Sequence, residues 1–146
     1  MTEGLSPSAF VAQVQTRIPN TFIDLLGIHL REISDEHAVA EMSCTKKLQQ
    51  LTGVFHAGAL VSLADTTATL ACLYWLHDPL DGSQAPFPLT IQLSTNFLRN
   101  TGHGTVKARA VPVHRGRTTT VVETRITDAD ERLLSVVTTT HLVLGG

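Results

Sequence analysis

Residues 58–76 read GALVSLADTTATLACLYWL, and this stretch decides the fold. Apolar side chains occur on almost every side of a helix built from it, so the helix must be covered on most sides. Its length also fits a membrane span. However, Asp65 lies near the middle, where an acidic side chain costs roughly 2.5–3.5 kcal/mol in a bilayer. We therefore expect the buried core helix of a soluble domain.

Short alternating segments on both sides of this helix predict β-strands. The expected strands are Ile28–Ile33, 37–43, 89–98, 105–114, 118–127 and 133–144. Strands joined by short turns are antiparallel. A sheet with one apolar face must bury that face, and the long helix is the only large candidate to cover it. We predict an α+β fold, in which one long central helix lies on an antiparallel sheet of about six strands.

The chain length predicts a single domain over 1–146, because 146 residues bury one good core without disulfides. Residues 1–26 are expected to form an N-terminal helical segment. Ser6 is a suitable N-cap before Pro7, and apolar residues follow at helical spacing.

The composition excludes several classes of protein. Lys and Arg are scattered and the net charge is −2, so the basic stripe of a nucleic-acid-binding protein is missing. The two cysteines, Cys44 and Cys72, fit a reducing compartment, and the N-terminus does not read as a signal peptide. We therefore expect a cytoplasmic protein without a nucleic-acid or membrane partner. Its seven histidines show no metal-ligand spacing, and we expect no metal or organic cofactor.

Asp65 is the first candidate catalytic residue. An ionised carboxylate inside such an apolar helix needs hydrogen-bond or charge partners, and it is rarely kept for packing alone. The alternative is a carboxylate that points from an uncovered side of the helix into water, or that pairs with a surface arginine.

The start of the helix is the second candidate. The backbone N–H groups of Ala57 and Gly58 lack partners within the helix and carry a partial positive charge. Such donors suit a developing oxyanion. An ordinary helix N-terminus has the same donors, so the residues alone leave both interpretations open.

Residues 50–69 hold a polar amide (Gln50), a glycine (Gly53), a histidine (His56) and an acidic residue in the next helix (Asp65). This pattern resembles the signature of the hot-dog acyl-CoA thioesterases, in the group of the phenylacetate-pathway and 4-hydroxybenzoyl-CoA thioesterases. The order of elements from about 28 to 144 agrees with it. The resemblance implies a single hot-dog domain, in which an antiparallel sheet of about five to six strands wraps the long central helix. It also implies hydrolysis of an acyl-CoA thioester to free acid and CoA.

The resemblance also implies roles for the two candidates. Asp65 would be the nucleophile on the thioester carbonyl or the general base on water, and the choice stays open. The polarising N–H would belong to Ala57, where the family usually has glycine. A backbone donor survives this change, while the extra methyl group bears on substrate size.

Three further residues receive supporting roles from the same resemblance. His56 would fix the catalytic loop, although a histidine there can equally be a cap or core residue. Gln50 would hold the water or the thioester, unless it is simply solvated like its neighbour Gln49. Thr69 lies one turn beyond Asp65 and would orient the hydrolytic water, or it bonds its own backbone.

The CoA moiety needs polar and basic partners, and arginine pairs well with phosphate. Charged residues in turns are often only solvated, which is the alternative for these positions. The candidate substrate-binding residues are Gly58, Asn96, Arg99, Arg115 and Arg117.

The spacing of Ala57 and Asp65 argues for more than one chain. Eight residues separate them, which is about 12 Å along a helix, whereas reacting groups must converge within roughly 3–3.5 Å. Two antiparallel helices related by a two-fold axis would bring Asp65 of one chain to Ala57 of the other. We expect a homodimer and, beyond it, a homotetramer.

Two other functions share the predicted fold. A hot-dog enoyl-CoA hydratase or dehydratase would need a histidine and a carboxylate acting together, and the spacing from His56 to Asp65 fits this less well. A non-catalytic acyl-CoA-binding module would normally carry a DNA-binding segment, and none is visible before Ile28.

Overall fold

The computed structural model describes residues 4–76 and 87–143. Its elements are α1 (Pro7–Arg17), α2 (Phe22–Leu26), β1 (Ile28–Ile33), β2 (Ala38–Ser43), the 3₁₀ helix η1 (Lys46–Leu48), α3 (Ala57–Trp75), β3 (Leu89–Phe97), β4 (Thr105–Arg115), β5 (Thr119–Thr127) and β6 (Leu133–Leu142). The long helix and the strands begin and end within two residues of their expected bounds. The expected strand end at residue 144 lies outside the described residues.

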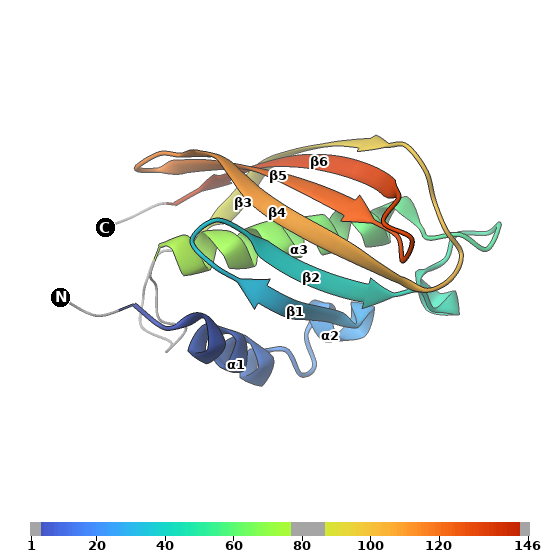
Figure 1. Cartoon of the computed structure of the whole chain (residues 1–146), viewed down its shortest axis with the longest axis horizontal. Coiled ribbons are helices and arrows are strands. Elements are labelled where there is room, and N and C mark those ends of the chain that lie inside the picture. Colours follow the sequence, from blue (N-terminus) through green and yellow to red (C-terminus); the bar gives the residue numbers. More distant parts are fainter. Residues whose placement is uncertain (1–3, 77–86, 144–146) are drawn as a thin grey trace.

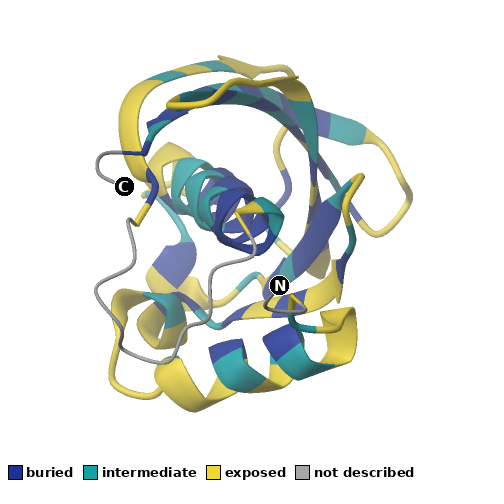
Figure 2. Ribbon diagram, turned by 90° about the vertical axis from the view of Figure 1, so that its left-hand side faces the viewer, coloured by how far each residue is buried: buried dark blue, intermediate teal, exposed yellow. Residues whose placement is uncertain are grey.

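One antiparallel sheet contains the six strands of the described chain, in the order β1-β2-β4-β5-β6-β3. β3 crosses to the far edge and pairs with β6, whereas β4, β5 and β6 follow one another through short turns. Figure 1 shows α3 lying along the sheet, and Figure 2 shows the sheet curving around the helix. The predicted α+β fold, with a long central helix wrapped by an antiparallel sheet, is confirmed.

The inner face of the sheet follows the two-residue alternation of β-strands. The buried positions are Thr120, Val122, Thr124 and Ile126 in β5, and Ser135, Val137, Thr139 and His141 among those in β6. These two rows pair with each other across the strands. The face that covers α3 therefore includes hydroxyl groups and one imidazole beside its apolar side chains.

The helix α3 is the centre of the core. Leu60 and Leu63 belong to one apolar cluster, and Leu70 and Leu73 belong to a second cluster that also contains Phe10 of α1. By length and composition α3 could cross a membrane. Its apolar side chains are instead buried against the sheet and α1, so it is a core helix, as the central aspartate predicted.

One face of α3 stays partly open in the single chain. Five side chains at helical spacing are only half-buried on it: Val61, Ser62, Asp65, Thr66 and Thr69. The residues at the helix start, Ala57 and Gly58, are exposed. The candidate carboxylate and the candidate oxyanion donor are thus both accessible from outside the chain.

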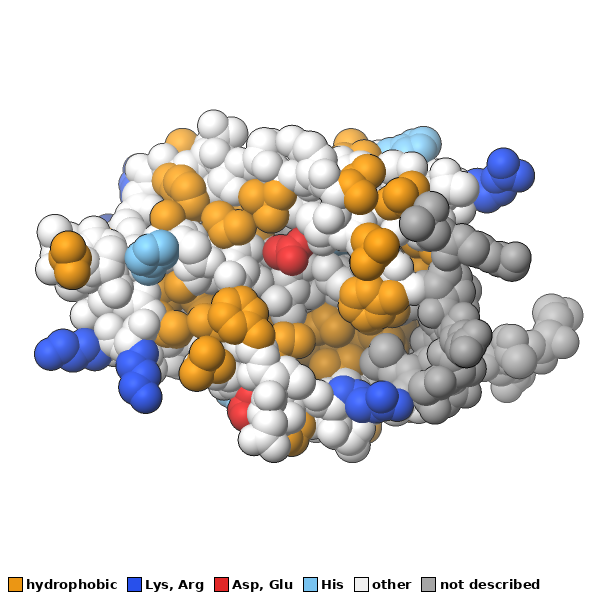
Figure 3. Space-filling model, turned by 180° about the vertical axis from the view of Figure 1, so that it is seen from behind, with side chains coloured by type: hydrophobic (Ala, Val, Ile, Leu, Met, Phe, Trp, Pro, Cys, Tyr) orange, Lys and Arg blue, Asp and Glu red, His pale blue; other side chains and the backbone are white. Residues whose placement is uncertain are grey.

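The sheet edge formed by β3 is open as well. Leu89, Ile91 and Phe97 of this strand are 50%, 58% and 47% exposed within the described chain. Figure 3, the view from behind, shows apolar side chains gathered around an acidic side chain near the centre of this face. Exposed apolar side chains along an unpaired strand edge indicate a surface for association.

Candidate active site

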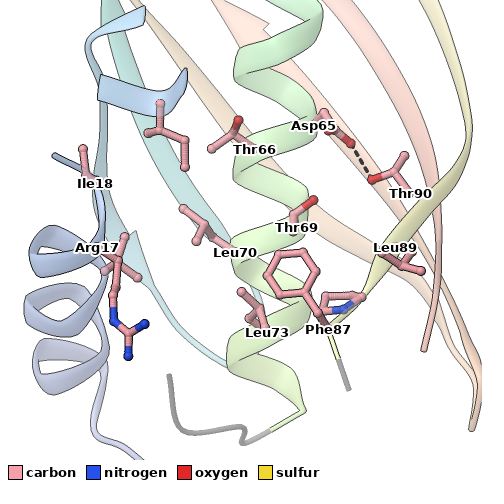
Figure 4. Close-up of a pocket in the computed structure, with 13 residues that line it drawn as sticks. Arg17, Ile18, Asp65, Thr66, Thr69, Leu70, Leu73, Phe87, Leu89 and Thr90 are labelled. Carbon is pink, nitrogen blue, oxygen red and sulfur yellow. Dashed lines mark hydrogen bonds between the residues drawn. The ribbon is translucent and has the colours of Figure 1, made fainter. Parts of the chain in front are cut away.

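Asp65 lies on the partly open face of α3 and is held by the first residues of β3. The hydroxyl group of Thr90 donates a hydrogen bond to Asp65 Oδ1 over 2.7 Å. Figure 4 shows this bond and shows both side chains at the rim of a cavity. Asp65 Oδ2 accepts no hydrogen bond from residues 4–76 or 87–143. One carboxylate oxygen is therefore fixed and the other is left for a ligand.

The cavity beside Asp65 has a volume of about 490 Å³. It lies between α1, α3 and the segment that leads into β3 (Figure 4). Most of the lining side chains are apolar, and the cavity is lined by Val14, Arg17, Ile18, Ile23, Asp65, Thr66, Thr69, Leu70, Leu73, Phe87, Pro88, Leu89 and Thr90. A largely apolar cavity with a few polar groups is typical of small-molecule sites.

At the start of α3, His56 is the N-cap. Its Nδ1 accepts a hydrogen bond from the Gly58 N–H over 2.8 Å, and its carbonyl oxygen accepts from the Ala59 and Leu60 N–H groups. The Gly58 N–H is thereby occupied. The Ala57 N–H has no acceptor among the described residues, so it is the donor that the helix start leaves for a ligand.

The loop before α3 is fastened to the segment after β3. The Phe55 N–H donates to the Thr101 carbonyl over 3.0 Å, and Asn100 Nδ2 donates to the Phe55 carbonyl over 2.8 Å. Gly102 lies so close that a Cβ atom on it would be 2.3 Å from the Gly53 carbonyl oxygen. Residue 102 must therefore be glycine for the two loops to meet.

The structure separates the neighbouring glutamines Gln49 and Gln50. Gln49 Nε2 donates to the Gly102 carbonyl over 3.2 Å, so this side chain helps to fasten the loop. Gln50 accepts a hydrogen bond from the Thr52 N–H through its Oε1. Within the described part of the chain, its amide nitrogen has no acceptor. Gln50 therefore keeps a donor for a ligand, while Gln49 is engaged structurally.

The candidate CoA-binding residues lie at two ends of the molecule. Asn96 and Arg99 lie where β3 ends, near the start of α3. The backbone N–H of Arg99 donates a hydrogen bond to the carbonyl oxygen of Leu134, at the start of β6. Arg115 lies at the other end, 4.2 Å from the ring centroid of Trp75, with which it makes a cation–π contact. A helix of 19 residues is about 28 Å long. Arg117 lies in the turn beyond Arg115, at the same end. One chain therefore does not bring the two groups of residues together.

Sequence reasoning missed Thr90, because a β-bulge is needed to place it. β3 pairs Thr90 with His141 and Leu93 with Thr139, and the register shifts between Thr90 and Gln92. In an unbroken strand Thr90 and Leu93 would point to opposite faces. The extra residue of the bulge puts both on the inner face, where Thr90 reaches Asp65.

Sequence reasoning also missed His141, which lies fully buried on β6. Its Nε2 lies 2.8 Å from Thr139 Oγ1, and its Nδ1 lies 3.4 Å from Thr90 Oγ1. Burial lowers the pKa of His141 below its ordinary value, and the nearby Asp65 carboxylate opposes part of this shift. The imidazole is therefore neutral at pH 7. Only its place in the alternating pattern of residues 133–142 could have indicated that it is buried.

Neither cysteine has the character of a nucleophile. Cys72 is buried in α3, and burial raises the pKa of its thiol to about 12. The half-buried Cys44 packs against the core, and its sulfur accepts a weak hydrogen bond from Gln49. In residues 4–76 and 87–143 no three His, Cys, Asp or Glu side chains gather in a way that could hold a metal ion.

Comparison with known proteins gives one consistent class. The sequence profile of the Thioesterase superfamily matches residues 52–135. ComA2 of Bacillus subtilis is 34% identical over 117 residues, which cover 80% of this chain and 89% of that protein. The 1,4-dihydroxy-2-naphthoyl-CoA hydrolase of Listeria monocytogenes is 29% identical over 113 residues, covering 77% and 87%.

A solved structure agrees with these sequences. The crystal structure of a mutant of thioesterase PA1618 from Pseudomonas aeruginosa superposes with a TM-score of 0.83 at 28% identity, and the match covers 92% of this chain and 93% of that one. The hot-dog fold and these similarities support thioester hydrolysis as the class of activity. The chain belongs to the thioesterase superfamily, and the resemblance drawn from residues 50–69 is confirmed.

The contact between the two loops gives a first prediction. Gly102→Ala should lower the free energy of unfolding by about 1–3 kcal/mol, because the added methyl group meets backbone rather than a flexible side chain. It should also remove most thioester hydrolysis, since the loop leading to His56 and Ala57 is displaced. Urea unfolding and an activity assay measure both effects.

Gly104→Ala is the matched control for that variant. It adds the same methyl group at a positive φ of 76°, where only Ala129 lies near, at 3.9 Å. The expected cost is about 1 kcal/mol of backbone strain, with activity retained. Equal losses of activity in Gly102→Ala and Gly104→Ala would contradict the role given to Gly102.

The buried imidazole gives a prediction for stability against pH. Because the folded-state pKa of His141 lies below its unfolded value of about 6.5, the unfolded chain binds the proton more readily. The contribution of neutral His141 to the free energy of unfolding is therefore fully present above pH 6.5. It is lost as the pH falls towards the folded-state pKa. Urea unfolding of the wild type and of His141→Gln should show a stability difference that shrinks between pH 7.5 and pH 5. A difference that is constant over this range would contradict the prediction.

Proposed function

We propose that this protein hydrolyses acyl-CoA thioesters to free acid and CoA, with Asp65 as nucleophile or general base. The observation that carries the proposal is the setting of Asp65: one oxygen is held by Thr90, and the side chain lies at the rim of a largely apolar cavity. The second oxygen can attack a thioester carbonyl or take a proton from water. The Ala57 N–H is the proposed oxyanion donor.

Supporting roles follow from the same geometry. Thr69 lines the cavity one helical turn from Asp65, in a position suited to orient a hydrolytic water. The free amide nitrogen of Gln50 is a donor for the thioester or for that water. His56 keeps the helix start in place as its N-cap, and by occupying the Gly58 N–H it leaves Ala57 as the donor.

The cavity supports an apolar acyl group as the substrate class. Leu70, Leu73 and Phe87 are among its walls, and the polar groups Asp65 and Thr90 lie at its rim. The Listeria monocytogenes relative is named for a CoA thioester with an aromatic acyl group. We propose aromatic or other compact apolar acyl-CoA thioesters as the first substrates to test.

A complete site would need two copies of the chain. Asp65 and Ala57 lie about 12 Å apart along α3, and both are accessible in the single chain. If the open β3 edge pairs with the same edge of a second copy about a two-fold axis, the sheet continues and the two α3 helices run antiparallel. Asp65 of one copy then approaches Ala57 of the other. The homotetramer and the cytoplasmic location stay predictions.

Release of free CoA thiol from a panel of aromatic and aliphatic acyl-CoAs tests the proposed function. We expect release without any added metal and in the presence of a chelator. Loss of enoyl absorbance without thiol release would instead indicate a hydratase, and binding without turnover would indicate an acyl-CoA-binding module. Either of these two results would overturn the proposal.

Asp65→Asn should lower kcat by two to four orders of magnitude, which is the usual contribution of a general base. Asn is nearly isosteric and keeps an oxygen for the Thr90 hydroxyl, so the melting temperature should change little. Steady-state kinetics and thermal unfolding measure the two quantities. An Asp65→Asn protein with wild-type kcat would remove Asp65 from the mechanism.

Mixing two inactive variants tests the shared site. Ala57→Pro deletes the N–H at a first-turn position that tolerates proline, and Ala57→Gly is its control because it keeps the donor. When Asp65→Asn and Ala57→Pro chains exchange at random, half of the dimers are mixed, and each mixed dimer has one intact site. About a quarter of wild-type activity should return. A mixture that stays inactive, although mixed dimers are shown to form, would contradict the two-chain site.

A further inference from the structure

A continuous line of hydrogen bonds leads from Asp65 into the core. Thr90 Oγ1 lies 2.7 Å from Asp65 Oδ1 and 3.4 Å from His141 Nδ1, and His141 Nε2 lies 2.8 Å from Thr139 Oγ1. The four residues come from α3, β3 and β6. His141 and Thr139 are fully buried, so water cannot replace a missing partner.

The direction of each bond follows from the groups themselves. A carboxylate only accepts, so Thr90 must give its single hydroxyl proton to Asp65. The Thr90 oxygen then accepts from His141, which requires the proton of the neutral ring to be on Nδ1. His141 Nε2 is then bare and accepts from the Thr139 hydroxyl. One tautomer satisfies every contact, and in it each bond points towards Asp65.

The cost of this arrangement argues that it is not incidental packing. Burying an imidazole and a hydroxyl group is unfavourable unless each is hydrogen-bonded. The bulge between Thr90 and Gln92 interrupts the ladder of an edge strand, and its effect is to turn Thr90 inwards. Valine at 90 or leucine at 141 would satisfy packing alone.

We infer that Thr90, itself oriented by His141, is a positioning residue for Asp65. It fixes Oδ1 so that Oδ2 faces the reacting group. The inference rests on the proposed function in so far as Asp65 reacts with the thioester. In the proposed site neither Thr90 nor His141 contacts the reacting atoms. Replacing either residue should therefore lower kcat rather than weaken substrate binding.

Thr90→Val and Thr90→Ser separate positioning from packing. Valine has the shape of threonine without the hydroxyl group, and we expect a loss in kcat of about 10–100-fold with KM within about twofold, because an unfixed carboxylate loses its alignment. Serine keeps the hydroxyl group and should restore most of kcat. Wild-type kcat in Thr90→Val, or equal losses in Thr90→Ser and Thr90→Val, would overturn the inference.

Two amide substitutions distinguish the hydrogen bond of His141 to Thr90 from its hydrogen bond to Thr139. The amide nitrogen of asparagine lies near the position of Nδ1 and can still donate to Thr90, whereas the longer glutamine reaches the position of Nε2 near Thr139. Among folded proteins, His141→Asn should therefore keep more of kcat than His141→Gln. The reverse order would contradict an orienting bond from His141 to Thr90.

A spectroscopic measurement tests the line of bonds without any assay. Two-bond ¹H–¹⁵N spectra of the His141 ring at pH 7.5 should show the Nδ1–H tautomer in the wild type and in Asp65→Asn. Thr90→Val removes the acceptor, and the ring should shift towards Nε2–H. An Nε2–H ring in the wild type would overturn the inference. A wild type that hydrolyses no acyl-CoA but has the Nδ1–H ring would instead overturn the proposed function.

Discussion

The structure depends on one energetically unfavourable feature, the carboxylate of Asp65 in the middle of the core helix. An aspartate there must keep access to water or find donors, because an isolated buried charge is far too costly. The protein meets this requirement twice. One face of α3 stays partly open at Asp65 and the residues around it, and Thr90 supplies a hydroxyl group to one oxygen. One oxygen of the carboxylate is thereby held in place, and the side chain stays accessible.

The second candidate group, at the start of α3, is a hydrogen-bond donor rather than an acceptor. There His56 caps the Gly58 N–H, and the Ala57 N–H has no acceptor in residues 4–76 or 87–143. The bonds from Asn100 and Thr101 keep the loop before the helix in place. Asp65 and Ala57 therefore lie about 12 Å apart on one rigid helix, which is why the proposed site draws on a second copy of the chain.

Much of this could be predicted because it depends on local pattern. The strands alternate with a period of two, the core helix is apolar on most sides, and Asp65 stands out as the charge within it. The antiparallel order followed from short turns. Thr90 could not be predicted, because a bulge reverses the parity of β3 and no residue in 89–98 signals it. His141 was missed for a related reason, since a buried histidine on an alternating strand reads as an ordinary core position. The large distance between Asn96 and Arg115 could not be predicted from the sequence, because it depends on the directions in which β3 and β4 run.

The polar groups around Asp65 also explain how the core is divided. Leu60 and Leu63 pack in one apolar cluster, and Ala68 and Leu70 pack in another, so the two clusters meet along α3 at the level of Asp65. Between them the buried Thr67 hydroxyl donates to the Leu63 carbonyl over 2.7 Å, and so needs no partner in the sheet. The apolar clusters on each side supply the stabilisation that a polar layer cannot. Rigid packing above and below a hydrogen-bonded layer is what allows a small domain to hold the Asp65 carboxylate in one orientation.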